Sequence, residues 1–418
     1  MPDYHLLAPG RLASLEFRPI AVVSAAVPPS PSGQARVLQH LLGSNLREQA
    51  TLLSDQIGLP GKSESPHPIG HYVRLAPPQF LLTSGWFSHR PRMHAIDNYL
   101  GLNSTIWRRA REIVAALRPN APAALVGCSG NPFDLPASFL AARRLGIPLL
   151  AYLFDDPVFQ WPPGIYRKLA RHWERLWARR AHAVIASNEY LVEDMLRREP
   201  KARMAMVRNP VADIAFAPEE MRWPASTERP FNIVYTGSVY HAQGDAFGNL
   251  VQALDRFGGQ AKLHLYTSQP GSVMTEHGLA GQHVVLHDYI DGPAIHKIQQ
   301  TADVVFLPLA FRSTIPEVIR TSAPAKMAEY IACGRPVLVH APHDSFISNF
   351  FRRNNCGVVV DRPEPADLVG ALRSIAEDPG LRARLRAATS AVSAEFRVER
   401  ARSIFWSLVR RAEGGPEH

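Results

Sequence analysis

The sequence predicts two tandem α/β domains, each built on a doubly wound and mostly parallel sheet. Three observations lead to this fold class. The chain has 418 residues, whereas a single hydrophobic core rarely extends past roughly 250 residues. Short apolar runs alternate with amphipathic stretches, which is typical of a parallel sheet covered by helices on both faces. One segment rich in proline and charge, residues 209–230, interrupts this alternation.

Seven apolar runs before the interruption are predicted to be strands. In chain order they are PIAVVSAA, ATLLSD, YVRLA, AALVGCS, PLLAYLFD, HAVIAS and MAMVRN. Helical periodicity lies between them at 106–117, 136–145 and 189–198. Residues 52–72 are rich in proline, glycine and serine and are predicted to form a long loop.

Six further runs after the interruption predict a second sheet. They are FNIVYTG, KLHLYTS, VVLHDYI, VVFLPLA, PVLVHA and GVVVD. Helices are predicted at 245–257, 294–301, 323–333, 346–354 and 366–377, and a last helical region ends near 411. The predicted organisation is therefore a first domain at 1–215, a linker at 216–230, a second domain at 231–395 and a closing helix at 396–418.

Composition indicates a globular protein of a reducing compartment, and the expected location is the cytoplasm. Apolar residues make up 46% and charged residues 20% of the chain, and its three cysteines form no Cys-x-x-Cys motif. The formal charge of +9 is scattered among acidic residues, so no nucleic-acid partner is expected. The apolar run 20–27 is far shorter than the roughly 20 residues of a membrane span, so neither a signal peptide nor an anchor is expected.

The densest basic segment, residues 166–180, has aromatic and leucine residues at helical spacing opposite its arginines. Two interpretations are open for this segment. Its charged side is either the solvated face of a helix over the domain core, or a surface that docks on an anionic membrane. The second interpretation would place the protein peripherally at the inner membrane surface.

The most informative stretch is RTSAPAKMAEYIACGRPVLV, residues 320–339. Ser322 is predicted to cap a helix over 323–333, with Pro324 in its first turn and Gly334 at its end. In an open parallel sheet, ligands bind at the carboxyl ends of the strands, where helices begin. A helix N-terminus attracts phosphate, and Lys326 adds a full positive charge there.

Glu329 lies three residues after Lys326 and therefore on the same side of that helix. A carboxylate there can accept hydrogen bonds from the vicinal hydroxyls of a ribose. Diphosphate at the helix tip and ribose one turn further describe a nucleoside diphosphate. The alternative is that Lys326 and Glu329 form an exposed ion pair. Gly237, at the end of the run FNIVYTG, favours the first interpretation, because glycine lets a ligand approach the backbone closely.

The runs VYTGSVY…GNLVQAL, TADVVFLPL and SAPAKMAEYIACGRPVLV resemble the C-terminal domain of GT-B glycosyltransferases. The resemblance is closest to the retaining, nucleotide-sugar-dependent family-4 type. In the first half, RRLGIPLLAYLFDDP and AHAVIASNEYLVEDML followed by VRNPV agree with it. The last helices, with the closing helix at 396–418, are similar to those that cross back to the first domain in this fold. The resemblance covers nearly the whole chain after Pro19.

The resemblance implies roles for particular residues. It implies that Glu329 binds the donor ribose and that Ser322 and Ala323 hold the diphosphate. Gly237 and Ser238 would let the donor lie close to the strand, and Gly33 with Ser32 would approach the phosphates from the first domain. The donor base would contact the segment around Tyr289 and Ile290. The catalytic candidates are Lys326, Asp155 and Asp156, in a cleft lined by the loops after Val27, Ser129, Asp155, Gly237 and Leu309.

The chain departs from the family pattern at three positions. The basic pair that often follows the glycine of YTGS is missing, and only His241 is present, so Arg312, Arg320 or Lys326 would have to supply that charge. Thr321 stands where a glutamate is frequent, eight residues before Glu329. Phe154 stands where relatives often have a histidine.

The predicted reaction is sugar transfer from a nucleotide-diphosphate sugar to an acceptor hydroxyl, with retention and without a metal. The acceptor would be a glycan, a lipid-linked sugar or a small molecule. Asp155 and Asp156 are adjacent and would point to opposite sides of a strand, and they form no Asp-x-Asp metal motif. For these two residues the alternative to catalysis is capping of the next segment. The histidines of HPIGHY have no further ligand at zinc spacing.

Two other functions remain open at this stage. A nucleotide-sugar epimerase would use the same cleft but needs acid and base residues that the sequence does not reveal. A non-catalytic nucleotide-sugar-binding protein or partner subunit would explain the missing basic pair. A dehydrogenase is not expected, because no Gly-x-Gly-x-x-Gly motif follows a first strand.

Overall fold

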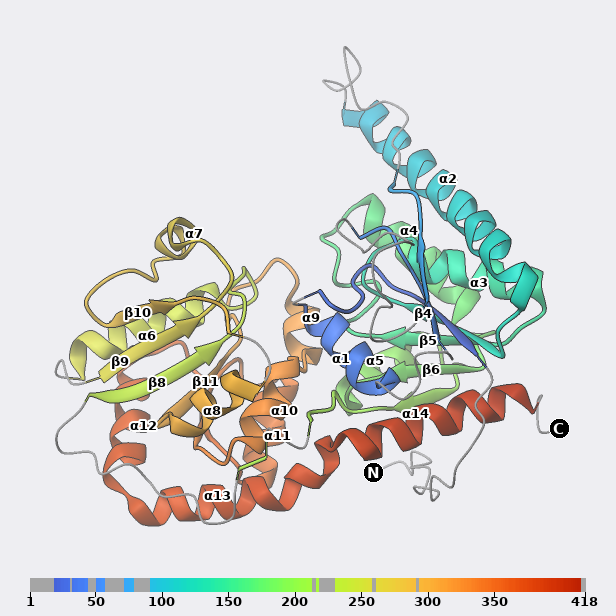
Figure 1. The fold of residues 1–418 in the computed structure, drawn as a ribbon. Helices are drawn as coiled ribbons and strands as arrows, with labels where there is room; N and C mark the ends of the chain where they lie inside the picture. The colour runs from blue at the N-terminus through green and yellow to red at the C-terminus, as the bar shows by residue number, and fades with distance from the viewer. Residues whose placement is uncertain are drawn as a thin grey trace. The chain divides into compact units, whose positions relative to one another are not determined.

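The computed structural model describes residues 19–30, 32–43, 50–56, 71–78, 91–212, 216–217, 230–257, 261–290 and 293–414. These residues form two compact units, one within Met1–Arg208 and Glu399–His418 and the other within Asn209–Val398 (Figure 1). Most of the predicted linker, and most of the predicted loop at 52–72, lie outside the described residues. We describe each unit separately.

The first unit is built on a parallel sheet of seven strands in the order β3-β2-β1-β4-β5-β6-β7. The strands are β1 (Ile20–Val23), β2 (Ala50–Ser54), β3 (His71–Arg74), β4 (Ala124–Cys128), β5 (Leu149–Leu153), β6 (Ala183–Ala186) and β7 (Met204–Met206). Every residue of β1, β4, β5 and β6 is buried. Burial of both faces explains why these strands are continuous apolar runs without polar alternation.

Helices cover both faces of this sheet. They are α1 (Gly33–Leu42), α2 (Pro91–Leu117), α3 (Asp134–Leu145), α4 (Ile165–Trp177), α5 (Glu189–Arg198) and α14 (Val398–Glu413). One core lies between the sheet and α2, α3, α4 and α5, and the other lies between the sheet and the pair α1 and α14. The last helix therefore belongs to the first unit, where the Trp406 indole donates to the Leu41 carbonyl at 3.2 Å.

The second unit has a parallel sheet of six strands in the order β10-β9-β8-β11-β12-β13. The strands are β8 (Phe231–Thr236), β9 (Ala261–Tyr266), β10 (Val284–His287), β11 (Val304–Pro308), β12 (Val337–His340) and β13 (Val358–Val360). The chain runs outward from β8 to β10 and then returns to the other side of β8 with β11. The strand order therefore reverses between β8 and β11, which makes this the topological switch point of the sheet.

The helices of the second unit again cover both faces. They are α6 (Gly244–Arg256), α7 (Gly271–Glu276), α8 (Pro293–Thr301), α9 (Pro316–Thr321), α10 (Ala325–Ala332), α11 (Phe346–Asn354), α12 (Pro365–Glu377) and α13 (Pro379–Ser393). A core joins α6, α7 and α12 to one face of the sheet. Of the other helices, α8 contacts β8, α10 contacts β11, and α11 contacts β12 and β13.

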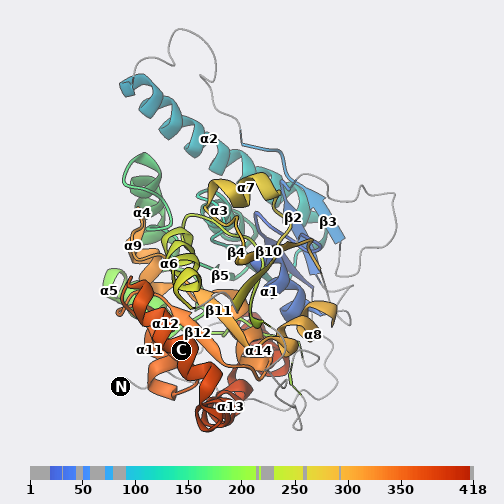
Figure 2. The same ribbon diagram turned by 90° about the vertical axis from the view of Figure 1, so that its left-hand side faces the viewer.

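The predicted fold class of two doubly wound domains is confirmed, and each of the thirteen predicted apolar runs overlaps a strand. The prediction was wrong at α2, which begins at Pro91 and not near residue 106 (Figures 1 and 2). Gly101 weakens helical propensity there, and the run Asn103, Ser104 and Thr105 is typical of caps and turns. Tertiary packing overrides these preferences, because Leu102 and Thr105 are almost fully buried.

The basic segment predicted at 166–180 contains helix α4. Its apolar face packs in the core of the first unit through Leu169, Trp173 and Trp177. The helix therefore lies over the domain core, and both interpretations of its charged face stay predictions. No helix in the described part of the chain combines the length and the apolar character that crossing a bilayer requires.

The side chain of Met327 is predicted to stabilise the second unit from α10. It is only 2% exposed, so Met327→Ala should lower the free energy of unfolding by about 2 to 5 kcal/mol through lost contacts and a cavity. Met327→Leu keeps the volume and should cost less than about 1.5 kcal/mol. Urea-induced unfolding measures both values. A loss below about 1 kcal/mol for the alanine variant would show that the residue does not support the core.

Candidate functional site

The candidate site of the second unit lies at the topological switch point of its sheet. Strand β8 ends at Thr236 and the neighbouring strand β11 ends at Pro308. Because the two strands are parallel neighbours, their carboxyl ends lie at the same edge of the sheet. The chain leaves β11, forms the short helix α9 and then enters α10, which carries Lys326 and Glu329.

Helix α10 begins later than predicted. Its first residue is Ala325, its N-cap position is held by Pro324, and no side chain caps it. Ser322 is therefore not the N-cap of α10 but the residue that ends α9, with an extended backbone at φ −68° and ψ 129°. The reason is that a proline disfavours helical geometry in the residue before it, here Ala323.

A side-chain hydrogen bond holds the connection between α9 and α10. The Asn209 side-chain amide donates to the Ala323 carbonyl at 2.8 Å. Ser322 and Ala323, which were predicted to hold a diphosphate, thus lie immediately before the first turn of α10. The first turn of a helix directs its backbone N–H groups toward this position.

Lys326 extends from the first turn of α10 to the end of β8. Its ammonium donates to the Tyr235 hydroxyl at 2.6 Å and lies 4.4 Å from the centre of the Tyr235 ring. The Tyr235 hydroxyl in turn donates to the Ser238 carbonyl at 2.7 Å. Burial raises the pKa of Tyr235 well above its ordinary value, so the phenol stays neutral and can donate this bond. The chain of two bonds fixes a positive charge beside the loop that follows β8.

Gly237 makes this path of the lysine side chain possible. Its backbone has φ +109°, a conformation that favours glycine. A Cβ atom at this position would lie 3.3 Å from the Lys326 Nζ atom and 3.4 Å from its Cε atom. Tyr235 and Thr236 are consecutive strand residues and therefore point to opposite faces of the sheet. The Lys326 side chain passes close to Gly237 to reach the Tyr235 hydroxyl. The predicted residues Lys326, Gly237 and Ser238 are therefore brought together.

Glu329 takes part in a buried network of hydrogen bonds at the end of β8. The Gln299 amide of α8 donates to the Glu329 carboxylate at 2.9 Å and to the Thr236 hydroxyl at 3.1 Å. The Tyr330 hydroxyl accepts from the Thr236 backbone N–H at 3.0 Å. Glu329 is only 5% exposed, so the alternative of an exposed ion pair with Lys326 is wrong.

Gln299 is the site residue that the sequence-based prediction missed, together with its partners Tyr235 and Thr236. Gln299 is fully buried on α8, four residues after the buried Ile295. The signal was therefore a glutamine on the apolar face of an amphipathic helix, where a buried amide must find a hydrogen-bonding partner. That partner is distant in sequence and becomes visible only once the topology is known.

The loops beside α10 are fixed by hydrogen bonds to their backbone. The Gln269 side-chain amide binds both the N–H and the carbonyl of Val239, at 2.6 and 2.9 Å. Asp245, at the start of α6, accepts from the backbone N–H groups of Phe311 and Arg312 at 3.0 and 2.8 Å. The side chains of His241 and Arg312, two candidates for the missing basic pair, are exposed on these loops.

The remaining candidates of the second unit lie in other loops. Tyr289 and Ile290 are half-buried in the segment that follows β10, which is separated from β11 by the two strands β9 and β8. Arg320 is half-buried in the last turn of α9. The Thr321 hydroxyl, at the position where relatives have a glutamate, donates to the Glu317 carbonyl at 3.1 Å within the same helix.

In the first unit, Gly33 is the first residue of α1, which follows β1. The Ser32 hydroxyl caps this helix by accepting from the Ala35 N–H at 3.1 Å. The order of the sheet reverses between β1 and β4, so Gly33 lies at the switch point of the first unit. Gly33 at the start of α1, and Asp155 and Asp156 in the loop after β5, are therefore all placed at the carboxyl edge of this sheet.

Asp156 has structural partners. One of its carboxylate oxygens accepts from the backbone N–H groups of Val158 and Phe159, both at 2.9 Å. The other oxygen lies 2.9 Å from the Arg198 guanidinium, and the residue is 1% exposed. Asp156 therefore caps the segment that follows it, as the alternative to a catalytic role predicts.

Asp155 is more exposed than Asp156. It is half-buried, and its backbone carbonyl accepts from the Ser129 hydroxyl at 3.3 Å. Burial, and to a smaller extent the charge of Asp156, raise the pKa of Asp155 to about 6. A carboxyl group that titrates near neutrality can exchange a proton with a bound hydroxyl.

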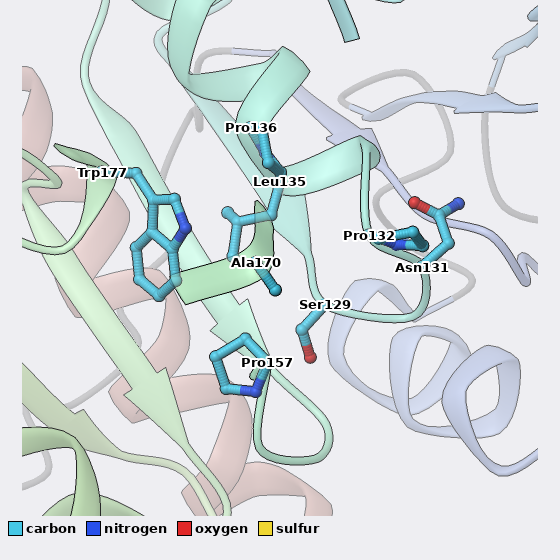
Figure 3. Close-up of a pocket in the computed structure, with 8 residues that line it drawn as sticks. All are labelled: Ser129, Asn131, Pro132, Leu135, Pro136, Pro157, Ala170 and Trp177. Carbon is cyan, nitrogen blue, oxygen red and sulfur yellow. The ribbon is translucent and has the colours of Figure 1, made fainter. Parts of the chain in front are cut away.

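A small pocket lies between the loops after β4 and β5 (Figure 3). Ser129 and Pro157 lie on one side of it, and Leu135, Ala170 and Trp177 close it. Its volume of about 10 Å³ is close to the space that one water molecule needs. The pocket is therefore too small for a sugar, and within the first unit it serves packing of these loops.

The described residues contain no group of three or more His, Cys, Asp or Glu side chains that could hold a metal ion. Lys326 and the N-terminus of α10 contribute positive charge at the candidate site.

The raised pKa of Asp155 predicts a pH-dependent stability. Between the ordinary value of 3.8 and about 6, the folded protein keeps a proton that the unfolded chain has lost, so stability falls as pH rises through this window. Asp155→Asn removes the unfavourable ionisation of this carboxyl group in the folded protein. The Tm of the variant minus the Tm of the unsubstituted protein should therefore increase from pH 3.5 to pH 7. Glu193→Gln, at an exposed carboxylate of α5, is the control. A Tm difference for Asp155→Asn that is constant with pH would contradict the assignment.

Residues 230–378 match the sequence profile of the family described as "Glycosyl transferases group 1", and they contain β8, α8, α10 and every bond of the network around Glu329. No curated protein matches the sequence.

Several solved structures share the fold at low sequence identity. HepE from Anabaena, solved in complex with UDP-glucose, is 14% identical with a TM-score of 0.63, covering 95% of this chain and 98% of that one. Sucrose-phosphate synthase from Thermosynechococcus elongatus is 17% identical with a TM-score of 0.67, covering 96% and 100%. WaaG, a glycosyltransferase involved in lipopolysaccharide biosynthesis, is 14% identical with a TM-score of 0.59, covering 94% and 98%.

The fold, the switch-point site and the matching profile agree with the resemblance seen in the sequence. Residues 230–378 match the glycosyl transferases group 1, and the whole chain shares its GT-B fold with solved glycosyltransferases.

Proposed function

We propose that the enzyme transfers a sugar from a nucleotide-diphosphate sugar to an acceptor hydroxyl, with retention of the anomeric configuration and without a metal ion. The observation that carries this proposal is the position of Lys326. Its ammonium is fixed by Tyr235 beside Gly237, at the N-terminus of α10. The fold relative HepE was solved with UDP-glucose, which supports a nucleotide sugar as the donor.

The diphosphate would bind where three sources of positive potential meet. The first turn of α10 contributes its N–H groups and the positive end of the helix dipole. Lys326 adds a full charge, and Gly237 lets the phosphate approach the backbone. The connection at Ser322 and Ala323 lies at the same helix entry, so its backbone would border the phosphates.

The ribose would bind one turn further along α10, at Glu329. A carboxylate has acceptor capacity for about four hydrogen bonds, and the Gln299 amide donates one to Glu329. Hydrogen bonds to a charged group are strong in a buried environment, because the local dielectric constant is low. Gln299 also binds Thr236, so the carboxylate is oriented relative to the end of β8.

The chemical step would develop negative charge on the departing diphosphate. Lys326 and the α10 dipole would stabilise that charge in a preorganised way, which lowers the barrier of the reaction. The acceptor hydroxyl would attack from the same face as the leaving group, and its proton would pass to a phosphate oxygen or to Asp155. Tyr289 and Ile290 would contact the base, and Gly33 the phosphates, as the family resemblance implies.

The acceptor is proposed to be a glycan, a lipid-linked sugar or a small molecule, as its hydroxyl is the only group that the reaction requires. A non-catalytic nucleotide-sugar-binding protein of the same fold is the alternative. The Thr321 hydroxyl is bonded within its own helix and supplies no carboxylate for sugar hydroxyls, which favours this alternative.

A panel of nucleotide sugars tests the proposed function. The matching donor should raise the Tm, since a ligand at 100 times its Kd adds about 2.7 kcal/mol. With an acceptor pool, it should be consumed with release of nucleotide, both with and without excess EDTA. Loss of turnover in EDTA that magnesium restores would contradict the metal-independent step. Stabilisation without turnover would support the binding-protein alternative. The anomeric configuration of the product, read by NMR, tests retention.

Glu329→Gln keeps the shape of the side chain and removes its charge. Since hydrogen bonds to a charged group contribute about 1.5 to 3 kcal/mol, the Kd for the donor should rise roughly 10-fold to 150-fold. Glu377→Gln makes the same chemical change on the exposed side of α12 and should leave the Kd unchanged. Calorimetric titration measures both variants. If folded Glu329→Gln binds the donor as tightly as the unsubstituted protein, Glu329 does not bind the ribose.

Lys326→Met removes the ammonium but keeps most of the side-chain length. We expect kcat to fall roughly 100-fold, with a smaller change in donor Kd, because the charge acts mainly on the leaving group. Tyr235→Phe removes only the hydroxyl that positions the ammonium and should give a smaller loss of kcat. Lys297→Met, at an exposed lysine of α8, is the control. Equal losses in kcat and donor affinity for Lys326→Met would contradict a role in the transition state.

A further inference from the structure

A second pocket lies at the amino edge of the sheet in the first unit, and the reaction proposed above does not use it. Its volume is about 220 Å³. Leu149 is the first residue of β5, His182 immediately precedes β6, and Arg203 immediately precedes β7. Because all strands of this sheet are parallel, these residues lie at the edge opposite to the loops that carry Gly33 and Asp155.

The pocket has an apolar floor. Phe139, Ala142 and Leu149 line it and are each less than 5% exposed, because they also belong to the core between the sheet and α3. Such a floor favours hydrocarbon over a fully hydrated ion. The volume is several times the roughly 30 Å³ that one water molecule occupies in the liquid, so part of an organic ligand fits.

The rim of the pocket carries three exposed arginines, Arg143, Arg180 and Arg203. In the described part of the chain, these guanidiniums contact carbonyl oxygens and a ring but no carboxylate. The Arg203 Nη2 atom donates to the Ala181 carbonyl at 2.8 Å, the Arg180 Nη1 atom donates to the Leu176 carbonyl at 3.4 Å, and Arg143 lies 5.8 Å from the centre of the Phe139 ring. The positive charge of the rim is thus not neutralised by an ion pair there.

His182 shows the effect of this charge. Burial lowers the pKa of His182, and the positive charges of Arg203 and of Arg411 on α14 lower it further. The imidazole therefore stays neutral near pH 7 while the arginines stay charged. An anion in the pocket would meet three guanidinium forks, the side chains that match phosphate oxygens best.

We propose that this pocket binds the phosphate of an amphiphilic phosphomonoester, with its apolar part on the floor of Phe139, Ala142 and Leu149 and its phosphate at Arg143, Arg180 and Arg203. The ligand could be a lipid headgroup within a membrane or a soluble phosphorylated molecule, and both share this chemistry. The site shares no residue with the proposed donor site, because Lys326 and Glu329 belong to the second unit.

The test uses the full-length protein and dihexanoyl phosphatidic acid below its micellar concentration. Titration should show saturable binding, and the double variant Arg143→Gln/Arg180→Gln should weaken it about 10-fold or more. Arg118→Gln/Arg175→Gln removes the same charge from exposed positions outside the pocket and should change the affinity less than about 2-fold. Equal losses in the two double variants would show non-specific attraction and overturn the proposal, as would the absence of saturable binding.

Three further probes identify the source of the ligand. Inorganic phosphate should compete weakly, and competition equal to that of dihexanoyl phosphatidic acid would overturn the role of the apolar floor. Pocket-dependent binding to phosphatidylcholine vesicles that contain phosphatidic acid, without competition by phenyl phosphate, would support a membrane lipid. The reverse result would support a soluble phosphorylated ligand. The kcat for a soluble acceptor should be unchanged in the pocket variant, because no pocket residue belongs to the proposed donor site.

Discussion

The candidate site of the second unit depends on the hydrogen bonds that tie α10 to the last residues of β8. Lys326 binds Tyr235, Tyr330 binds the backbone of Thr236, and Glu329 binds Gln299, which also binds Thr236. The helix and the strand are joined across nearly a hundred residues of sequence, and both lie at the switch point of the sheet. Because the bonds of Thr236 and Glu329 are buried, breaking one leaves a polar group without water, which costs more than the bond itself contributes. The same bonds therefore support the fold and place the charges of the site.

Much of the fold could be predicted because its signals are local. Thirteen apolar runs mark thirteen strands, since a strand covered on both faces must be apolar throughout. The positions of Lys326, Glu329 and Gly237 could also be predicted, as helix entries at strand ends carry ligands in this type of sheet. What failed depended on tertiary context. Helix α10 begins later than predicted because of Pro324. Helix α2 begins well before the part of its sequence that shows helical periodicity. Gln299 has its hydrogen-bonding partners on two other elements, β8 and α10.

The first unit separates two kinds of chemistry at the two edges of one parallel sheet. The carboxyl edge carries Gly33 and Asp155, which the family resemblance assigns to the sugar-transfer site. The amino edge carries the pocket of Arg143, Arg180 and Arg203. Strands of a parallel sheet are rigid and buried, so the two edges can accept different ligands without sharing residues. If the pocket binds an anionic lipid, it would hold the first unit at a membrane.

A crystal structure with the nucleotide-diphosphate sugar selected by the stability panel tests the central claim most directly. We expect the diphosphate within hydrogen-bonding distance of the Lys326 ammonium and of the first turn of α10, and the ribose hydroxyls on the Glu329 carboxylate. The bonds from Lys326 to Tyr235 and from Gln299 to Glu329 should be present in the complex or exchanged directly for ligand contacts. A donor bound with its phosphates away from the α10 N-terminus, or with its ribose away from Glu329, would contradict the account.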